Sequence, residues 1–202
     1  ADTTQEAGII WLSGSQNFEV MKGVEETLAG RVVILNLLGL SNKEAQIPII
    51  TPQDYFSWIW KSSFPKIHLE NDSDAIDLYL SSYVKTYIER DIRELLGIQK
   101  RREFEIFLKV AALRSGQIIN YDDMARDVGV SNVTIKGWIS VLEDSFIIKL
   151  IQPIFTNKTK RLTKSPKMYF LDTGLCSYLA GWKEAEQLRL SPSAGAIFET
   201  HV

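Results

Sequence analysis

Seven residues, 158 to 164, carry four cations and no acid. Lys158, Lys160, Arg161 and Lys164 lie in a polar stretch between two apolar runs. Closely spaced cations of this kind bind nucleic-acid phosphates, and such contacts position a protein on a duplex without reading its sequence. The alternative is a solvated loop in a fold that packs against protein, and the sequence leaves both open.

A second set of polar side chains begins at Ser131. Asn132, Thr134 and Lys136 follow at or near the start of a predicted helix, where they would reach base edges if the helix entered the major groove. Gly137 offers no side chain there, so we expect modest discrimination among sequences. The predicted DNA-binding residues are Ser131, Asn132, Thr134, Lys136, Lys158, Lys160, Arg161 and Lys164.

The elements that must position these side chains form a predicted helix-turn-helix over residues 121–145. Ala125 is small where two helices would cross, Gly129 tolerates positive φ in the turn, and Ser131 can cap the second helix. The predicted apolar faces comprise Met124, Val128, Val130, Ile135, Trp138, Ile139 and Leu142. Residues 146–151 and 167–171 predict strands on either side of the cationic stretch, which completes a winged helix.

The net charge of −2 is unevenly distributed along the chain. Residues 1–99 hold 8 Lys/Arg and 14 Asp/Glu, residues 100–167 hold 13 and 7, and residues 168–202 hold 2 and 4. The middle block is therefore basic between acidic neighbours, as expected of a nucleic-acid binder. The same asymmetry would also let the middle block dock on the acidic one.

The composition is that of an ordinary globular protein, with 202 residues, 45% hydrophobic and 24% charged. The single Cys176 excludes an internal disulfide and fits a reducing compartment. Because no apolar stretch is long enough to span a bilayer and no secretory signal begins the sequence, we expect a cytoplasmic protein without membrane contact. The absence of an initiator Met fits a fragment.

Strands and helices are also predicted outside the central block. Residues 9–12 and 32–38 predict buried strands around a helix over 18–28, one unit of a parallel α/β sheet. Further helices are predicted over 54–64, from Ser73 to about Gly97, over 102–113 and after Asp172. The fold class expected is α+β and mainly helical.

Several separated motifs, taken in order, resemble a family of predicted prokaryotic AAA+ ATPases that carry a winged helix and a C-terminal domain of unknown function. The motifs are SGSQ at 13–16, LAGRV at 28–32, LNLL at 35–38, YVKTYIERDIR at 83–93, VTIKGWIS at 133–140, KSPKMYFLDTGL at 164–175 and GAIFE at 195–199. The resemblance covers essentially the whole chain. Gly39 departs from it, since family members usually have Pro there.

The resemblance implies four segments. Residues 1–50 would be the end of a parallel α/β AAA-type ATPase core and residues 51–99 a helical lid or linker. Residues 100–171 would be the winged helix, and residues 172–202 the start of a domain similar to PD-(D/E)xK nucleases.

The resemblance also assigns roles to Ser13 and Arg31. Ser13 would be the sensor-1 residue of the ATPase, and Arg31 the arginine finger that neutralises transition-state charge in a neighbouring subunit. The full-length protein would then bind ATP and Mg²⁺ and form a homo-oligomer through the ATPase core. The alternatives are a turn serine that caps a helix and an arginine that binds free carbonyls at a helix C-terminus.

No P-loop, G-x-x-x-x-G-K-[ST], occurs in the sequence, nor an apolar strand ending in an Mg²⁺-binding acid. We therefore expect both upstream in a longer protein, and no tightly bound cofactor on this chain alone.

Asp172 and Glu199 could belong to a nuclease-like acidic cluster, although capping and surface roles are the simpler interpretation. His68 and His201 are far apart and have no Cys partners, so no metal site is predicted.

The leading hypothesis is a fragment of a AAA+ ATPase that couples ATP binding and hydrolysis to DNA or a protein partner through a winged helix. The alternatives are a winged-helix DNA-binding regulator and a nuclease-like DNA-processing protein.

Overall fold

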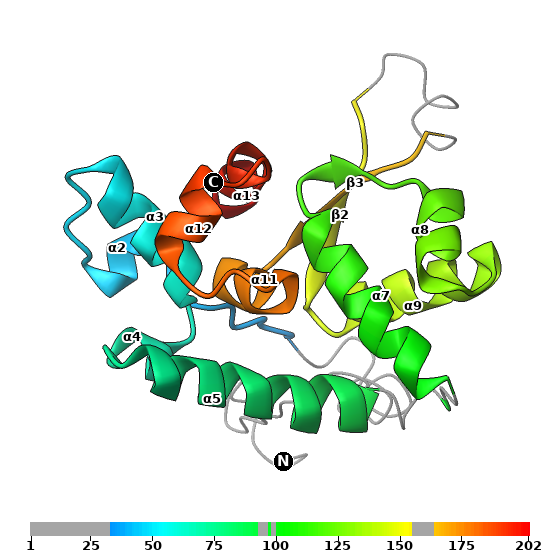
Figure 1. Cartoon of the computed structure of the whole chain (residues 1–202), viewed down its shortest axis with the longest axis horizontal. Coiled ribbons are helices and arrows are strands. Elements are labelled where there is room, and N and C mark those ends of the chain that lie inside the picture. The colour runs from blue at the N-terminus through cyan, green and yellow to red at the C-terminus, as the bar shows by residue number, and fades with distance from the viewer. Residues whose placement is uncertain (1–32, 93–96, 98–99, 155–163) are drawn as a thin grey trace, which may run out of the picture. The chain divides into compact units, whose positions relative to one another are not determined.

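The computed structural model describes residues 33–92, 97, 100–154 and 164–202. The chain divides into two compact units, residues 1–36 and 37–202, and only the last four residues of the first are described. The second unit is mainly helical with a small antiparallel sheet (Figure 1). Within the described ranges, no helix is both long and apolar enough to cross a membrane.

The second unit begins with three short helices, α2 (Asn42–Ala45), α3 (Pro52–Lys61) and α4 (Pro65–His68). Two of them, α2 and α3, start at capping boxes. The hydroxyls of Ser41 and Thr51 accept from the backbone N–H three residues on, and the carboxylates of Glu44 and Asp54 accept from the backbone N–H of Ser41 and Thr51. The helix predicted over 54–64 is α3, displaced by two residues towards the N-terminus at its start.

The long predicted helix is divided into an α-helical part, α5 (Ser73–Tyr83), and a π-helical part, η1 (Val84–Ile92). Its cap is Asp72 rather than Ser73. The buried residues Ile76, Leu80, Val84, Ile88 and Ile92 recur every four positions. In an α-helix that spacing rotates the apolar stripe by about 40° per step. The wider π turns reduce this drift and keep the stripe on the core.

The described residues between 101 and 170 form three helices and three strands. The helices are α7 (Arg101–Leu113), α8 (Tyr121–Val128) and α9 (Asn132–Asp144), and the strands are β1 (Gln117–Ile118), β2 (Ile148–Ile151) and β3 (Lys167–Phe170). The strand order is β1-β3-β2, with both pairs antiparallel. The sequence predicts β2 and β3 but not β1, whose two residues are too few to give an alternating pattern.

The turn between α8 and α9 has the predicted local chemistry. Gly129 has φ 80°, and Ser131 caps α9 by accepting from the backbone N–H of Thr134. The predicted apolar faces are buried, apart from Val130, which is half-buried. These expectations are confirmed.

Three helices follow the sheet, α11 (Thr173–Ala180), α12 (Ala185–Leu190) and α13 (Ala194–His201). Asp172 caps α11, in agreement with the predicted turn and helix start. α11 packs against both α7 and α3, so it connects the helices before and after residue 100.

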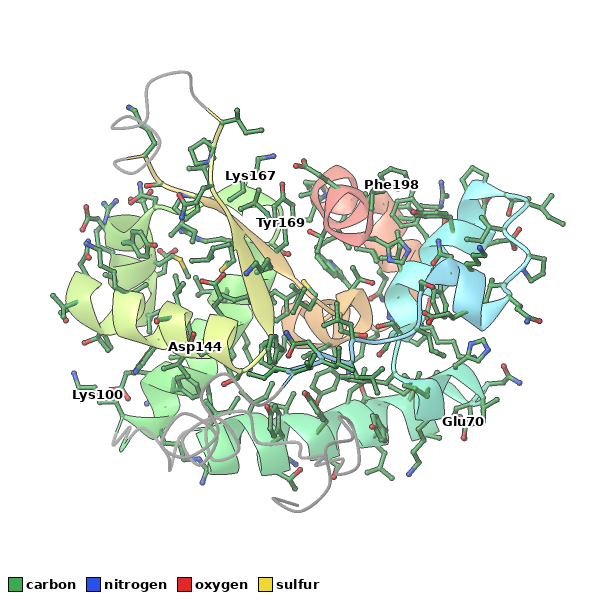
Figure 2. The ribbon with its side chains drawn as sticks, turned by 180° about the vertical axis from the view of Figure 1, so that it is seen from behind. Glu70, Lys100, Asp144, Lys167, Tyr169 and Phe198 are labelled. Atoms are coloured by element: carbon green, nitrogen blue, oxygen red, sulfur yellow. The ribbon has the colours of Figure 1, made fainter. Side chains whose placement is uncertain are left out.

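The two faces of the β2–β3 hairpin differ in character. The inner face pairs Ile148 with Phe170 and Leu150 with Met168. The outer face pairs Lys149 with Tyr169 and Ile151 with Lys167. Figure 2 shows Lys167 and Tyr169 on the side of β3 near α13.

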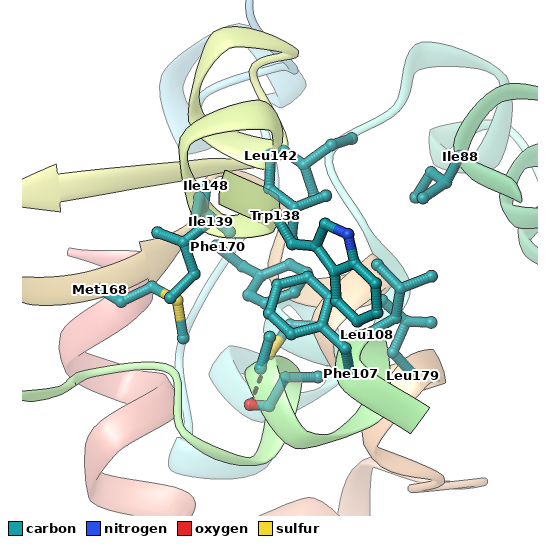
Figure 3. Close-up of a cluster of buried hydrophobic side chains, with 14 of the residues drawn as sticks. Ile88, Phe107, Leu108, Trp138, Ile139, Leu142, Ile148, Met168, Phe170 and Leu179 are labelled. Carbon is teal, nitrogen blue, oxygen red and sulfur yellow. Dashed lines mark hydrogen bonds between the residues drawn. The ribbon is translucent and has the colours of Figure 1, made fainter. Parts of the chain in front are cut away.

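One hydrophobic core runs from Ile59 to Ile197 and includes residues of α3, η1, α7, α8, α9, the sheet and α11 to α13. Side chains of α7, α9, β2, β3 and α11 meet in its centre (Figure 3), where the Cys176 thiol donates to the carbonyl of Ala112. Burial raises the pKa of this thiol far above its ordinary value, so it stays protonated and acts as a small apolar group.

The strand predicted over 32–38 is not formed by its described residues. Residues 33–38 have no regular secondary structure, and Val33, Leu35 and Leu37 are exposed. A strand needs a neighbour to satisfy its backbone groups, and the sheet of the described residues contains only β1, β2 and β3. The predicted strand over 9–12 and helix over 18–28 lie outside the described residues.

Two glycines of the α8–α9 segment predict opposite changes in stability when each is replaced by alanine. Gly129 has positive φ, so Gly129→Ala should lower the free energy of unfolding by about 1 kcal/mol. Gly137 lies within α9, and a Cβ there would meet nothing within 4 Å. Gly137→Ala should therefore raise the free energy of unfolding by up to ~1 kcal/mol. Urea unfolding followed by circular dichroism measures both, and a shift of the same sign in both variants would contradict this expectation.

Candidate nucleic-acid interface

The start of α9 is held by short-range hydrogen bonds. The Ser131 hydroxyl accepts from the Thr134 backbone N–H at 3.1 Å and lies 2.8 Å from the Thr134 hydroxyl. The Asn132 side-chain amide donates to the carboxylate of Asp122 on α8. Three of the four residues predicted here are therefore engaged with neighbours in the same pair of helices.

The remaining predicted residue, Lys136, is exposed and its ammonium lies 5.4 Å from the centre of the Tyr121 ring. Val133 and Gly137, on the exposed surface of α9, add no hydrogen-bonding side chain. Residues 120–145 contain two cations, Arg126 and Lys136, against five acids. The start of α9 is therefore poor in available donors, and the α8–α9 segment as a whole is acidic.

The β2–β3 hairpin has the opposite charge. Residues 146–167 contain six cations and no acid: Lys149, Lys158, Lys160, Arg161, Lys164 and Lys167. Lys149 and Lys164 are exposed, although the Lys149 ammonium lies 3.3 Å from the Glu143 carboxylate of α9, and Lys167 is half-buried on the outer face. Lys158, Lys160 and Arg161 lie outside the described residues. The basic character of residues 100–167 is therefore concentrated before α8 and after α9.

A carboxylate from α13 lies against this outer face. Glu199 Oε1 accepts from Lys167 Nζ and from the Tyr169 hydroxyl, each at 2.6 Å. The hydrogen bond with Lys167 lowers the pKa of Glu199, and the same bond raises the pKa of Lys167, so both stay charged. Desolvation, followed by the bond to Glu199, raises the pKa of Tyr169, which therefore keeps its proton to donate.

Asp172 lies elsewhere and is buried. Its Oδ2 accepts from the Ser62 hydroxyl at 2.9 Å, the Ser63 hydroxyl at 2.7 Å and the Ser63 backbone N–H at 2.8 Å. Its Oδ1 accepts from the Leu175 backbone N–H at 2.6 Å. Four donors satisfy the buried charge and join the end of α3 to the start of α11.

Close backbone packing accompanies these bonds. A Cβ at Gly174 would overlap the backbone of Ser62, so glycine is required for the approach. Asp172 and Glu199 share no bonding partner, and the structure does not bring the two predicted acids into one cluster. Among the described residues, no group of three His, Cys, Asp or Glu side chains is arranged to hold a metal ion.

Ser13 and Arg31 lie outside the described residues, so their predicted roles stay predictions. His201 and His68 lie on separate helices. Burial lowers the pKa of His201, whose Nε2 lies 3.1 Å from the Asn42 side-chain oxygen.

Lys167 and Tyr169 were not predicted as binding residues from the sequence. Their spacing of two within a predicted strand indicates a shared face, which is the signal that could have paired them. Nothing in the local sequence indicates that Glu199, 32 residues after Lys167, would bind them.

Comparison with known proteins gives a family but no activity. A domain of unknown function, DUF8612, matches residues 52–186. Two uncharacterized proteins, from Mycobacterium bovis and Mycobacterium tuberculosis, are each 28% identical over 194 residues. The match covers 94% of this chain but only 42% of each relative. No solved structure matches.

The Asp172 bonds predict a large effect of removing one charge. Asp172→Asn should lower the free energy of unfolding by about 2 kcal/mol, since one amide cannot accept all four donors. Glu184→Gln is the matched control, because Glu184 is exposed and its side chain makes no capping bond. Thermal unfolding of both variants tests this, and equal stabilities would contradict a structural role for the Asp172 carboxylate.

Proposed function

Because the chain belongs to the DUF8612 family, whose function is unknown, we propose from its geometry that residues 100–171 form a winged helix that binds duplex DNA mainly through phosphates. The observation that carries this proposal is the contrast between a basic hairpin, with six cations and no acid, and an acidic pair of helices. In the longer protein, this binding would be coupled to a AAA+ ATPase core.

The order of elements supports the winged-helix assignment. α7, β1, α8, α9 and the β2–β3 hairpin follow one another, and β3 lies between β1 and β2 in the sheet. In such a module the second helix of the pair faces the major groove, and the hairpin contacts the backbone beside it. α9 and the cationic stretch occupy these two positions in the sequence.

The hydrogen bonds of α9 favour phosphate binding over base reading. Reading bases would require Asn132 and Thr134 to exchange their bonds with Asp122 and Ser131 for bonds to base edges. The carboxylate of Asp122 on α8 would repel the duplex at close approach, whereas that of Asp123 is ion-paired with Arg126. Affinity would therefore come from the hairpin and depend strongly on salt.

For the longer protein, the proposed activity is ATP binding and hydrolysis with Mg²⁺, in a homo-oligomer. Its support is the resemblance, which assigns Ser13 as sensor 1 and Arg31 as arginine finger. The bonds of Asp172 to Ser62 and Ser63 would connect the helical segment to α11, directly after the winged helix.

A nuclease function is less well supported by the described residues. Both oxygens of Asp172 are occupied by hydrogen-bond donors, and Glu199 is bound to Lys167 and Tyr169. A regulator that binds DNA without ATP is the runner-up. It would be favoured by a strong preference for one duplex sequence.

DNA binding should depend on the hairpin cations. Replacing Lys158, Lys160, Arg161 and Lys164 with Ala should weaken binding to all duplexes alike and lower the salt slope by about one unit for each phosphate that is no longer bound. A salt titration of fluorescence anisotropy, with the 202-residue chain and a random-sequence duplex, measures this.

The matched control removes the same charge elsewhere, at Lys43, Lys66, Lys85 and Lys183, all of which are outside the hairpin. This variant should keep most of the salt slope. Thr134→Ala with Lys136→Ala should leave the preference among sequences nearly unchanged. Absence of binding at low salt would contradict the proposed function and would favour docking of the basic face on protein.

The 202-residue chain should not hydrolyse ATP at a rate above background. It contains no P-loop, which would supply the main phosphate contacts. A phosphate-release assay with ATP and Mg²⁺ checks this, with Ser13→Ala as the comparison. Turnover that disappears in Ser13→Ala would show that the chain has a complete site of another kind.

A further inference from the structure

The outer face of β3 presents two hydrogen-bond donors that converge on a single oxygen atom. Lys167 and Tyr169 are two residues apart on β3, and both bind Glu199 Oε1 at 2.6 Å. Residues spaced by two on a strand share a face, so the ammonium and the hydroxyl are held side by side by the sheet. Figure 2 shows both side chains between the strand and α13.

An ammonium and a hydroxyl that converge on one oxygen atom can bind oxyanions in general, carboxylates and phosphates alike. Lys167 supplies charge without a fixed geometry, and Tyr169 adds a directed donor. The pair therefore has the chemistry of a phosphate contact, with a carboxylate now bound to it.

Lys167 and Tyr169 lie on β3, which is one strand of the cationic hairpin. In the sheet, Lys149 is paired with Tyr169, and its ammonium lies 3.3 Å from the carboxylate of Glu143 on α9, so Lys167 and Tyr169 alone form the pair of donors. β2 and β3 then continue into the stretch that contains Lys158, Lys160, Arg161 and Lys164. A duplex backbone that contacts the hairpin tip could extend to Lys167 and Tyr169.

Glu199 could leave the pair without displacement of its helix. α13 is also held by the Ser115 and Thr200 hydroxyls, 3.1 Å apart, and by the ring contact of Phe198 with Tyr55. The Glu199 side chain is 49% exposed, so a rotamer change could move its carboxylate into solvent. The cost would be that of a partly exposed ion pair, which is small.

We propose that Lys167 and Tyr169 form a binding site for a phosphate group of duplex DNA, and that Glu199 occupies this site in the free protein as a displaceable carboxylate. Glu199 therefore weakens DNA binding. This inference rests on the proposed DNA binding and adds to it a defined contact and an internal competitor.

The test is the affinity of Glu199→Gln for a random-sequence duplex, measured by fluorescence anisotropy with the 202-residue chain. The variant should bind about two- to fivefold more tightly, which corresponds to the removal of one competing ion pair. Its salt slope should stay nearly unchanged, because the displaceable carboxylate lets the same phosphate contact form in the wild-type complex. Glu186→Gln is the control, since Glu186 also forms an ion pair, with Arg189, but on α12.

A further variant with unchanged net charge distinguishes a defined phosphate site from a non-specific effect of net charge on DNA affinity. Adding Tyr169→Phe to Glu199→Gln removes one donor and no charge, and it should cancel part of the gain. Lys167→Gln in the same background should cancel the gain and lower the salt slope by about one unit, because one phosphate contact is lost. Circular dichroism of each variant verifies that the total helical content of the chain is unchanged.

The outcomes distinguish this inference from the proposed function. If the tip cations control binding but Glu199→Gln binds no more tightly than Glu186→Gln, the inference is wrong and the proposed function stands. If the gain survives Tyr169→Phe in full, a general charge effect explains it and the inference is wrong. If no variant binds duplex DNA at low salt, the proposed function fails, and the inference fails with it.

Discussion

The buried carboxylate of Asp172 is the polar constraint around which the second unit is arranged. A charge removed from water must be satisfied by donors, and here they come from Ser62, Ser63 and Leu175. Ser62 and Asp172 are 110 residues apart in the chain, so their bond fixes a non-local contact that apolar packing alone would leave adjustable. The helices before residue 100 and those after the sheet consequently share one core.

This shared core explains how one module can present two surfaces of opposite charge. The inner residues of α7, α8, α9 and the sheet pack together, which leaves the outer residues free to vary in charge. The segment of α8 and α9 has more acids than cations, whereas residues 146–167 have six cations and no acid. The arrangement favours contact with a charged backbone over recognition of individual bases.

Local features of this fold could be predicted from the sequence, and long-range ones could not. Gly129 and Ser131 follow from turn and capping chemistry, which involves only a few neighbouring residues. The π turns after Tyr83 were missed, because the sequence indicates a helix but not its pitch. The exposed residues 33–38 were mistaken for a buried strand, since composition does not reveal whether a partner strand is present. The contact of Glu199 with Lys167 and Tyr169 depends on how α13 packs on the sheet, which the sequence does not indicate. The sequence predicts only that Lys167 and Tyr169 share one face of a strand.

The four-residue spacing along α5 and η1 has a further consequence for this helix. Because each residue advances an α-helix by about 100°, and a π-helix by somewhat less, removal of one residue near Val84 would turn everything beyond it by nearly that angle. Ile88 and Ile92, now in the core, would then face a different direction, and the Tyr87 ring would move away from Tyr83. The number of residues along α5 and η1 therefore determines which side chains face the core. Substitutions along it can be absorbed singly, but an insertion or deletion changes the register of every later contact.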